Sequence, residues 1–271
     1  MSLTFSKPPL VEIVVELRWI PTKAVEGQQT LTPTVSIPFL QSSKLDEFFL
    51  RIGVQLHQYG YTVVERLMPP GFAVSQQPVY RYRKGIDPAP VLFQAGDGIF
   101  SIHAVPPYHS WEGFQPVVEQ GLKALLEARE DSQKQVPFGR VSLRYIDAFT
   151  EELRAGLSAP DFISKVLGVS VGMPPVLVHL LKQGASPQLG LQIGIPSAGG
   201  TLLSLNLGEA SVNGKPAVVM DTTLARTEET APELGHIRDV LLSGYQIMHT
   251  LFLDLTRPIH ELMKPSEAVK S

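Results

Sequence analysis

Two stretches of the chain alternate apolar and polar residues with the period of a β-strand. Near the amino terminus the apolar positions are Val11, Ile13, Val15, Leu17 and Trp19. In the segment 140–149 they are Val141, Leu143, Tyr145 and Phe149. Such alternation is typical of a strand with one buried and one exposed face. We predict that the two strands lie side by side in one sheet, with their apolar faces turned inward.

Longer segments carry the 3.6-residue period of amphipathic helices. One apolar stripe consists of Leu45, Phe48, Phe49, Ile52, Leu56 and Tyr59. It predicts a helix that Ser43 caps and Gly60 ends. The same period predicts a helix over 111–129 and the longest helix over 231–255. A short helix is predicted to follow the N-cap residue Ser158.

The remaining elements are predicted from shorter signals. Alternating runs predict strands in the first half at 79–84, 91–94 and 100–104. In the second half they predict strands at 176–182, with a continuation towards 195 left open, at 202–207 and at 217–225. Between the last two, Asn213-Gly214 is a hairpin signal. Residues 20–42 are rich in proline and polar residues and are predicted to form a long loop.

These elements predict an α+β fold with antiparallel-dominated sheets and helices packed on one face. The first half, 1–150, has the order strand, helix, strands, helix, strand, which resembles a split β-α-β arrangement. Residues 151–175 are predicted to form a linker with a short helix. Residues 176–271 are predicted to hold β-hairpin strands and the long carboxy-terminal helix. We expect the apolar stripe of that helix to face the core, and a dimer surface is the alternative.

Composition restricts the class of protein without naming a function. The chain has 271 residues, of which 44% are hydrophobic and 18% charged, with a net charge of −3, as is ordinary for a globular protein. This charge gives no reason to expect nucleic acid as a partner. The absence of cysteine excludes disulfides and thiolate metal ligands. No apolar run has the length of a leader or a membrane span, so we expect a cytoplasmic protein.

The polar side of the first-half sheet is the strongest candidate for a binding surface. If the apolar sides of the strands face the helices, several charged residues share the opposite face. The candidate binding residues are Glu12, Glu16, Arg18, Arg81, His103 and Arg144. In this arrangement Arg144 could pair with Glu12 or Glu16 across adjacent strands. The alternative is a solvent-facing surface whose charges neutralise one another, which is normal for an antiparallel sheet.

No motif of catalysis, cofactor binding or metal binding stands out. The histidines include no His-x-His or His-x-x-x-His pair, so neither a metal nor a cofactor is expected. An enzyme with a site between the two halves is an alternative, with His103, Arg144 and Asp147 as candidate groups. Asp147 and Asp221 could form a carboxylate pair, although strand-end capping is the simpler interpretation.

Four segments taken together resemble a known family. They are the opening Lys7–Trp19 with its Pro-Pro and Val-Glu pairs, the tract Phe93–Leu122 with Trp111-Glu112, the motif Leu143-Arg144-Tyr145-Ile146, and the closing helix His249–Thr256. In this combination the chain is similar to an uncharacterised, sporadically distributed bacterial family. It has Asp147 where that family usually has Asn. The resemblance implies a prokaryotic protein without an established activity, so no catalytic residue is carried over.

The patchy occurrence of that family implies an immunity or defence role. We therefore expect a non-catalytic binding protein of bacterial origin. It would hold a protein partner on its charged sheet face, and a homodimer is a second expectation. Besides the enzyme, the alternative is a nucleic-acid-linked defence factor that would use Arg81, Arg83 and Lys84.

Overall fold

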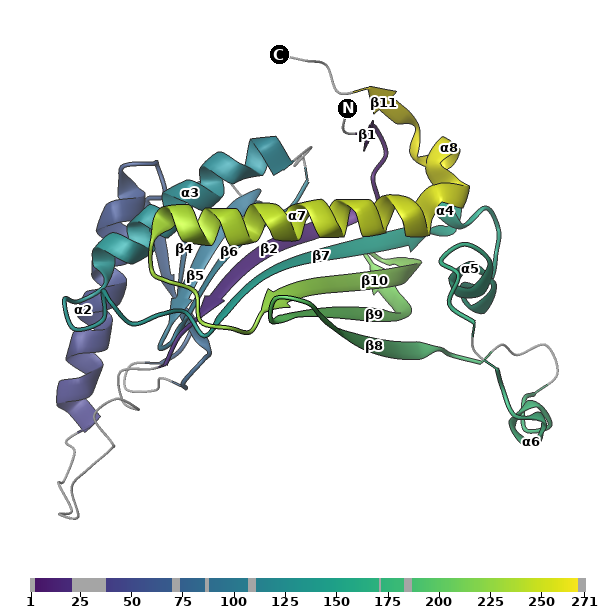
Figure 1. Ribbon diagram of the computed structural model, residues 1–271, viewed down its shortest axis with the longest axis horizontal. Coiled ribbons are helices and arrows are strands. Elements are labelled where there is room, and N and C mark those ends of the chain that lie inside the picture. Colours follow the sequence, from purple (N-terminus) through teal and green to yellow (C-terminus); the bar gives the residue numbers. More distant parts are fainter. Residues whose placement is uncertain are drawn as a thin grey trace.

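The computed structural model describes residues 3–20, 38–69, 74–85, 88–106, 111–170, 172–182 and 187–267. The chain has an α+β fold built on one nine-stranded antiparallel sheet (Figure 1). In spatial order its strands are β3 (Val63–Arg66), β4 (Pro78–Arg83), β5 (Val91–Gly96), β6 (Ile99–Ala104), β2 (Leu10–Arg18), β7 (Arg140–Thr150), β10 (Lys215–Arg226), β9 (Thr201–Val212) and β8 (Gly190–Ser197). A separate two-stranded sheet pairs β1 (Leu3–Phe5) with β11 (Pro265–Glu267).

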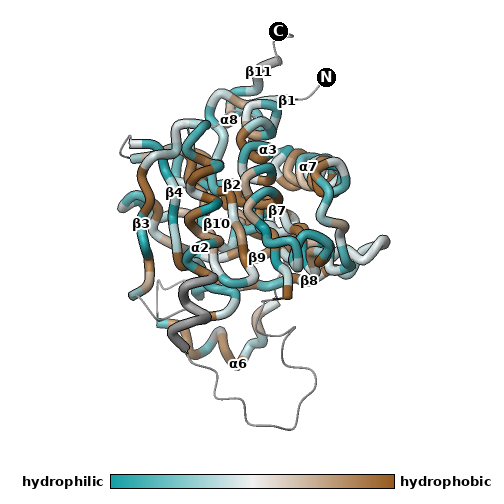
Figure 2. Tube along the Cα trace, turned by 90° about the vertical axis from the view of Figure 1, so that its left-hand side faces the viewer, coloured by the Kyte–Doolittle hydropathy of each residue, from teal (hydrophilic) through white to brown (hydrophobic). Residues whose placement is uncertain are grey.

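Three long helices lie on one face of the large sheet. They are α2 (Pro38–His57), α3 (Trp111–Ala128) and α7 (Leu234–Thr256). In the side view of Figure 2, α3 and α7 stand together beside the strands. The short helical elements are α4 (Glu151–Arg154), α5 (Ala159–Lys165), α6 (Pro175–Val178), η1 (Arg257–Ile259) and α8 (His260–Met263). None of the helices in the described ranges is both long and apolar enough to cross a membrane.

The two alternating segments are adjacent strands, which confirms the prediction from their pattern. β2 lies between β6 and β7, and Val15 of β2 stands opposite Leu143 of β7. Ile13 and Leu17 are fully buried on the side of the helices. Burying each such side chain contributes about 1.5–3 kcal/mol to stability. Because side chains alternate along a strand, the neighbouring Glu16 turns to the other face.

A β-bulge at the start of β2 changes its register against β7. Leu10 stands opposite Asp147 while Glu12 stands opposite Ile146, so Val11 is the extra residue. Bulges redirect side chains and are frequent beside functional sites. Here Leu10 and Asp147 both come to line one pocket between the sheet and α7.

Two apolar clusters form the core. The first lies beneath α2 and α3 and includes Phe93 and Leu125, and the second lies at the other end of β7 and includes Phe149 and Phe162. Helix α7 joins them, since Ile237 near its start belongs to the first cluster and its last turns pack on the second. One sheet thus runs through both 1–150 and 176–271, and their division into subdomains stays a prediction.

Local signals at two turns are confirmed. Ser158 caps α5, because its Oγ accepts a hydrogen bond from the backbone N–H of Asp161 at 3.3 Å. Asn213 and Gly214 connect β9 to β10 with φ values of 51° and 75°. Positive φ at both positions is what a two-residue type I′ hairpin turn requires.

Several boundaries differ from the prediction. Helix α2 begins at Pro38, so Ser43 lies inside the helix and does not cap it; proline fits a first helical turn, where its missing N–H is not needed. The segment 176–182 is not a strand, because it contains part of α6, and β8 begins only at Gly190. The short strand β3 was not among the predicted elements, because its four residues show no alternation of apolar and polar side chains. Of the predicted loop 20–42, residues 21–37 lie outside the described residues.

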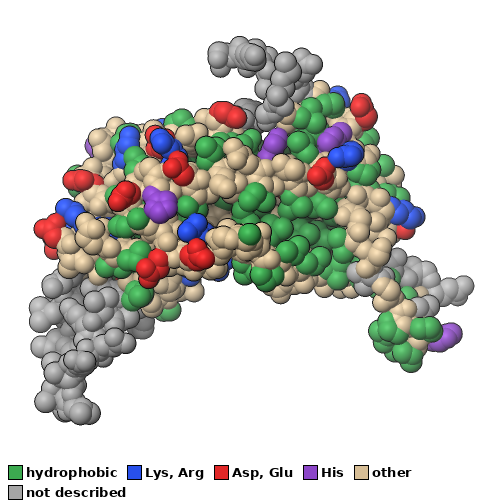
Figure 3. Space-filling view, viewed as in Figure 1, with side chains coloured by type: hydrophobic (Ala, Val, Ile, Leu, Met, Phe, Trp, Pro, Cys, Tyr) green, Lys and Arg blue, Asp and Glu red, His purple; other side chains and the backbone are tan. Residues whose placement is uncertain are grey.

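The helices leave part of the sheet uncovered. β8 turns Leu191, Ile193 and Ile195 to the helix side, in register with leucines of β9. Ile195 is 49% exposed, and Ile247 on α7 is 45% exposed. Figure 3 shows a continuous apolar surface below α7, over the end of the sheet formed by β8–β10. Contiguous apolar surface of this kind marks interaction sites on many proteins.

Candidate functional site

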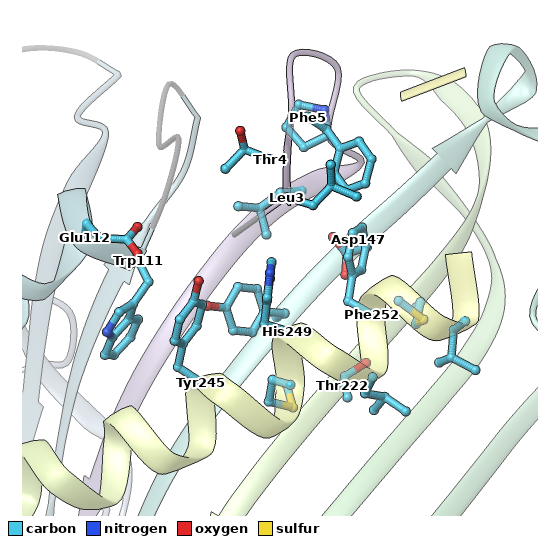
Figure 4. A pocket seen from close by; sticks show the side chains of 17 residues that line it. Leu3, Thr4, Phe5, Trp111, Glu112, Asp147, Thr222, Tyr245, His249 and Phe252 are labelled. Atoms are coloured by element: carbon cyan, nitrogen blue, oxygen red, sulfur yellow. The ribbon is translucent and has the colours of Figure 1, made fainter. Parts of the chain in front are cut away.

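A pocket lies between α7 and the sheet, beside the small β1–β11 sheet (Figure 4). Its walls come from the amino-terminal segment, the start of α3, the strands β7 and β10, and the second half of α7. The cavity that water-sized molecules can occupy has a volume of about 120 Å³. This is room for several waters or for a small organic molecule.

A row of stacked rings forms one wall of the pocket. The rings of Trp111 and Tyr245 are 5.2 Å apart and nearly parallel, at 11°. Tyr245 in turn stacks on His249 at 5.5 Å; the two are four residues apart on α7, so they share one face of the helix. Phe252 meets Phe5 of β1 edge to face at 6.2 Å. Two helices and the amino-terminal strand thus jointly supply the aromatic wall.

The carboxyl group of Asp147 lies on the sheet side of the pocket, across from α7 (Figure 4). Asp147 is 3% exposed, and no described residue forms a hydrogen bond or ion pair with its side chain. Burial raises the pKa of this carboxyl from 3.8 to about 7, because the charged form loses its hydration and gains no partner. At neutral pH the protonated and ionised forms are therefore both populated.

Two rings of the row, His249 and Trp111, also carry polar groups. Burial lowers the pKa of His249, an effect that the Glu112 carboxylate partly opposes, so the imidazole is mostly neutral at pH 7. The indole Nε1 of Trp111 is buried and meets no hydrogen-bond acceptor within the described part of the chain. Buried polar groups are normally hydrogen-bonded, which makes this donor a second polar group that a ligand could satisfy.

This arrangement can hold a small apolar molecule and orient one polar group on it. The walls are mainly apolar and aromatic, and a few polar atoms converge on the space, as in most small-molecule sites. The Asp147 carboxyl can accept a hydrogen bond, donate one, or exchange a proton near neutral pH. Across the ranges that the structure describes, no group of three or more His, Asp and Glu residues could hold a metal ion.

The residues predicted to bind a partner lie on the opposite face of the sheet, which we call the open face. They are Glu12, Glu16, Arg18, Arg81, His103 and Arg144. Arg18 donates two hydrogen bonds to Glu16, at 2.6 and 3.1 Å, and His103 Nδ1 lies 2.8 Å from a Glu12 oxygen. The strand pattern therefore places these side chains on one face, while their binding role stays a prediction.

The remaining charges of the open face are also paired, but not as expected. Arg144 donates to Asp221 of β10 at 2.8 and 2.7 Å, and not to the glutamates of β2. β10 lies directly beside β7, so Asp221 is within reach of the guanidinium. The Nη1 atom of Arg81 lies 3.6 Å from the Oε2 atom of Glu65 on β3. The charges largely neutralise one another in pairs, which is the alternative that the sequence left open.

The groups considered for an enzyme site do not come together. His103 and Arg144 lie on the open face, whereas Asp147 lies in the pocket on the helix side. Positions 144 and 147 are an odd number of residues apart on one strand, so their side chains point to opposite faces. Asp221 shares the face of Arg144, and therefore it forms no carboxylate pair with Asp147.

The aromatic wall was not predicted, because Trp111, Tyr245 and His249 come from helices that are far apart in the sequence. A signal for the pocket was nevertheless present. In the strand pattern, Asp147 occupies an inward position between the apolar residues Tyr145 and Phe149. A carboxyl on the buried face of a strand needs an explanation, since aspartate is seldom buried unless it is paired.

Comparison with known proteins adds little to this description. No protein-family model matches the chain, and no curated protein sequence matches it. Among solved structures, the chain is weakly similar to the di-domain ARO/CYC StfQ from the steffimycin biosynthetic pathway. The identity is 8% and the TM-score is 0.19, over 67% of this chain and 73% of that one. A likeness at this level supports no conclusion about fold or function.

Proposed function

We propose that this chain is a non-catalytic binding protein whose ligand is a small, largely apolar molecule held between α7 and the sheet. The observation that supports this most strongly is Asp147, a carboxyl that is 3% exposed in the wall of a pocket and has no partner among the described residues. The stacked rings of Trp111, Tyr245 and His249 supply the apolar contact area.

A purely structural role for Asp147 would be hard to explain. Burying a carboxyl without a compensating hydrogen bond is unfavourable by several kcal/mol, and an apolar residue of similar size would fill the same space at no such cost. Titratable groups with strongly shifted pKa values gather at functional sites. The presence of this destabilising carboxyl is therefore explained if a bound ligand supplies the hydrogen-bond partner that the protein does not.

The proposal is tested by filling the pocket. Leu251 lies on α7, lines the pocket and is partly exposed, so Leu251→Trp should place an indole in the cavity with little change to the core. We expect members of a library of small apolar compounds to raise the melting temperature of the unmodified protein. The same compounds should leave that of Leu251→Trp unchanged.

The matched control is Leu242→Trp, on the same helix but outside the pocket, where the side chain is 39% exposed. It should respond to compounds as the unmodified protein does. If no compound distinguishes the unmodified protein from Leu251→Trp, the pocket is not a ligand site and the proposal fails.

We further propose that a second copy of this chain pairs with the edge strand β8. β8 is at one edge of the large sheet, is eight residues long and carries no charged residue, and it adjoins the uncovered apolar surface. The opposite edge strand, β3, has four residues and carries Glu65 and Arg66. Charges, prolines and short length protect an edge from pairing. β8 is therefore the edge more open to it, over residues 190–195 ahead of Pro196. Two copies of one strand can pair antiparallel about a two-fold axis.

A protein partner on the open face, and with it an immunity or defence role, remains a prediction from the sequence. The ion pairs of that face leave it with little unbalanced charge to offer a partner. Reversal of the charges at Arg18 and Arg144 would abolish such binding if the face were used.

A further inference from the structure

The charged groups that line the pocket are of one sign. Asp147 and Glu112 are carboxyl groups, and the described residues of the lining include no lysine or arginine. His249 is the basic group on the lining, and because burial lowers its pKa the imidazole is mostly uncharged at pH 7. An anionic ligand would therefore be buried beside negative charge without a counter-charge, which is strongly unfavourable. A cation would meet a favourable potential.

The aromatic wall supplies apolar contact area, and the preference for a cation comes from the carboxyls. The rings of Trp111, Tyr245 and His249 turn their faces to one another, and the face is the part of a ring that attracts an ammonium group. In the view of Figure 4, Trp111 and Glu112 stand at one end of the pocket, Asp147 at the other, and Tyr245 and His249 between them. A cation in this space therefore lies between two carboxyl groups.

We propose that the ligand is an ammonium compound with an apolar body, whose N–H groups donate hydrogen bonds to Asp147. This inference rests on the proposed function of the pocket. An ammonium donor would give the carboxylate a charge-assisted hydrogen bond. This bond would offset the unfavourable free energy of burying the ionised carboxylate away from water. The apolar body would lie against Met220 and Met248 and the aromatic wall.

Three probes of matched shape test the charge of the ligand. They are 2-phenylethylammonium, the neutral 2-phenylethanol and the anionic 3-phenylpropanoate. Their affinities for the full chain are measured by isothermal titration calorimetry at pH 8, where a carboxyl with a pKa of about 7 is mostly ionised. We expect the ammonium probe to bind at least about tenfold more tightly than the alcohol, and the carboxylate probe to bind most weakly.

The substitution Asp147→Asn tests whether Asp147 is responsible for the preference for a cationic ligand. This isosteric change should remove the preference for the ammonium probe over the alcohol while leaving the affinity for the alcohol within about twofold, since the cavity keeps its shape. Asp221→Asn removes a carboxylate from the open face and should leave all three affinities unchanged. Glu112 lies at an exposed position of the rim, and Glu112→Gln gives a second variant. It should lower the affinity for the ammonium probe by about two- to threefold.

The outcomes separate the two proposals. If the alcohol binds the unmodified protein as tightly as the ammonium probe does, or if Asp147→Asn keeps the ammonium preference, the ligand class is wrong while the pocket remains a binding site. If none of the three probes binds and the compound library also fails to distinguish Leu251→Trp, the proposed function itself is contradicted.

Discussion

Asp147 makes the stability of the protein depend on pH. Its pKa is raised from 3.8 to about 7 in the folded state, so the folded protein binds this proton more tightly than the unfolded chain does. The contribution of this group to the free energy of unfolding is then highest below pH 4, decreases as the pH rises from about 4 to about 7, and changes no further above that. The loss is at most roughly 4 kcal/mol, since each pKa unit corresponds to about 1.4 kcal/mol.

Asp147→Asn should remove this dependence. The amide has no charge to desolvate, so the variant should be more stable than the unmodified protein at pH 8 by up to roughly 4 kcal/mol, and the difference should disappear near pH 4. Urea unfolding curves at several pH values measure the effect. Asp221→Asn serves as the control and should not reproduce it, because Asp221 is paired with Arg144. Equal pH dependence in Asp147→Asn and the unmodified protein would show that the carboxyl is solvated or paired.

At the level of elements, β8 offers a test of self-association. Ile193 lies on the apolar side of this edge strand, and a lysine there would bring charge to an interface that has none. We expect Ile193→Lys to weaken dimerisation at least about tenfold, as measured by sedimentation velocity over a range of concentrations.

Val64→Lys is the matched control for that experiment. Val64 is a similar β-branched residue, 46% exposed, on the opposite edge strand β3. Its replacement should leave the oligomeric state unchanged. A protein that is monomeric at all concentrations, or a dimer that Ile193→Lys does not weaken, would refute the pairing through β8.

The elements differ in how well their sequence predicted them. Strands β2 and β7 and helices α3 and α7 carry long periodic patterns, and these patterns predicted their type and the pairing of the two strands. The sequence predicts the start of helix α2 too late, because Pro38 resembles a loop signal although proline also begins helices. Segment 176–182 is apolar without a clear period, and such short runs do not separate strand from helix.

The candidate site was harder to predict than the fold. Alternation correctly placed Arg18 and Arg144 on one face, but the ion-pair partner of Arg144 depends on strand order, which puts Asp221 beside it. The pocket also depends on contacts between distant segments, since Trp111 meets Tyr245 only after both helices pack on the sheet. Local patterns cannot predict such contacts.

Taken as a whole, the molecule has one open sheet face whose charges are paired. Its helix side is packed at one end and exposes apolar surface at the other (Figure 3). The pocket lies where the two core clusters adjoin, beneath the second half of α7. The β1–β11 sheet lies beside its mouth and contributes Phe5 to the lining. Both ends of the described chain thus lie next to the pocket.

The ionisation of Asp147 tests the central claim most directly. A pH titration of its side-chain carboxyl by carbon-13 NMR, assigned by the signal that Asp147→Asn removes, should give a pKa of about 7 in the free protein. Saturation with 2-phenylethylammonium should lower that pKa, because the bound cation stabilises the carboxylate. A pKa near 3.8 in the free protein would mean that the carboxyl is already solvated or paired, and the account of the pocket would then be contradicted.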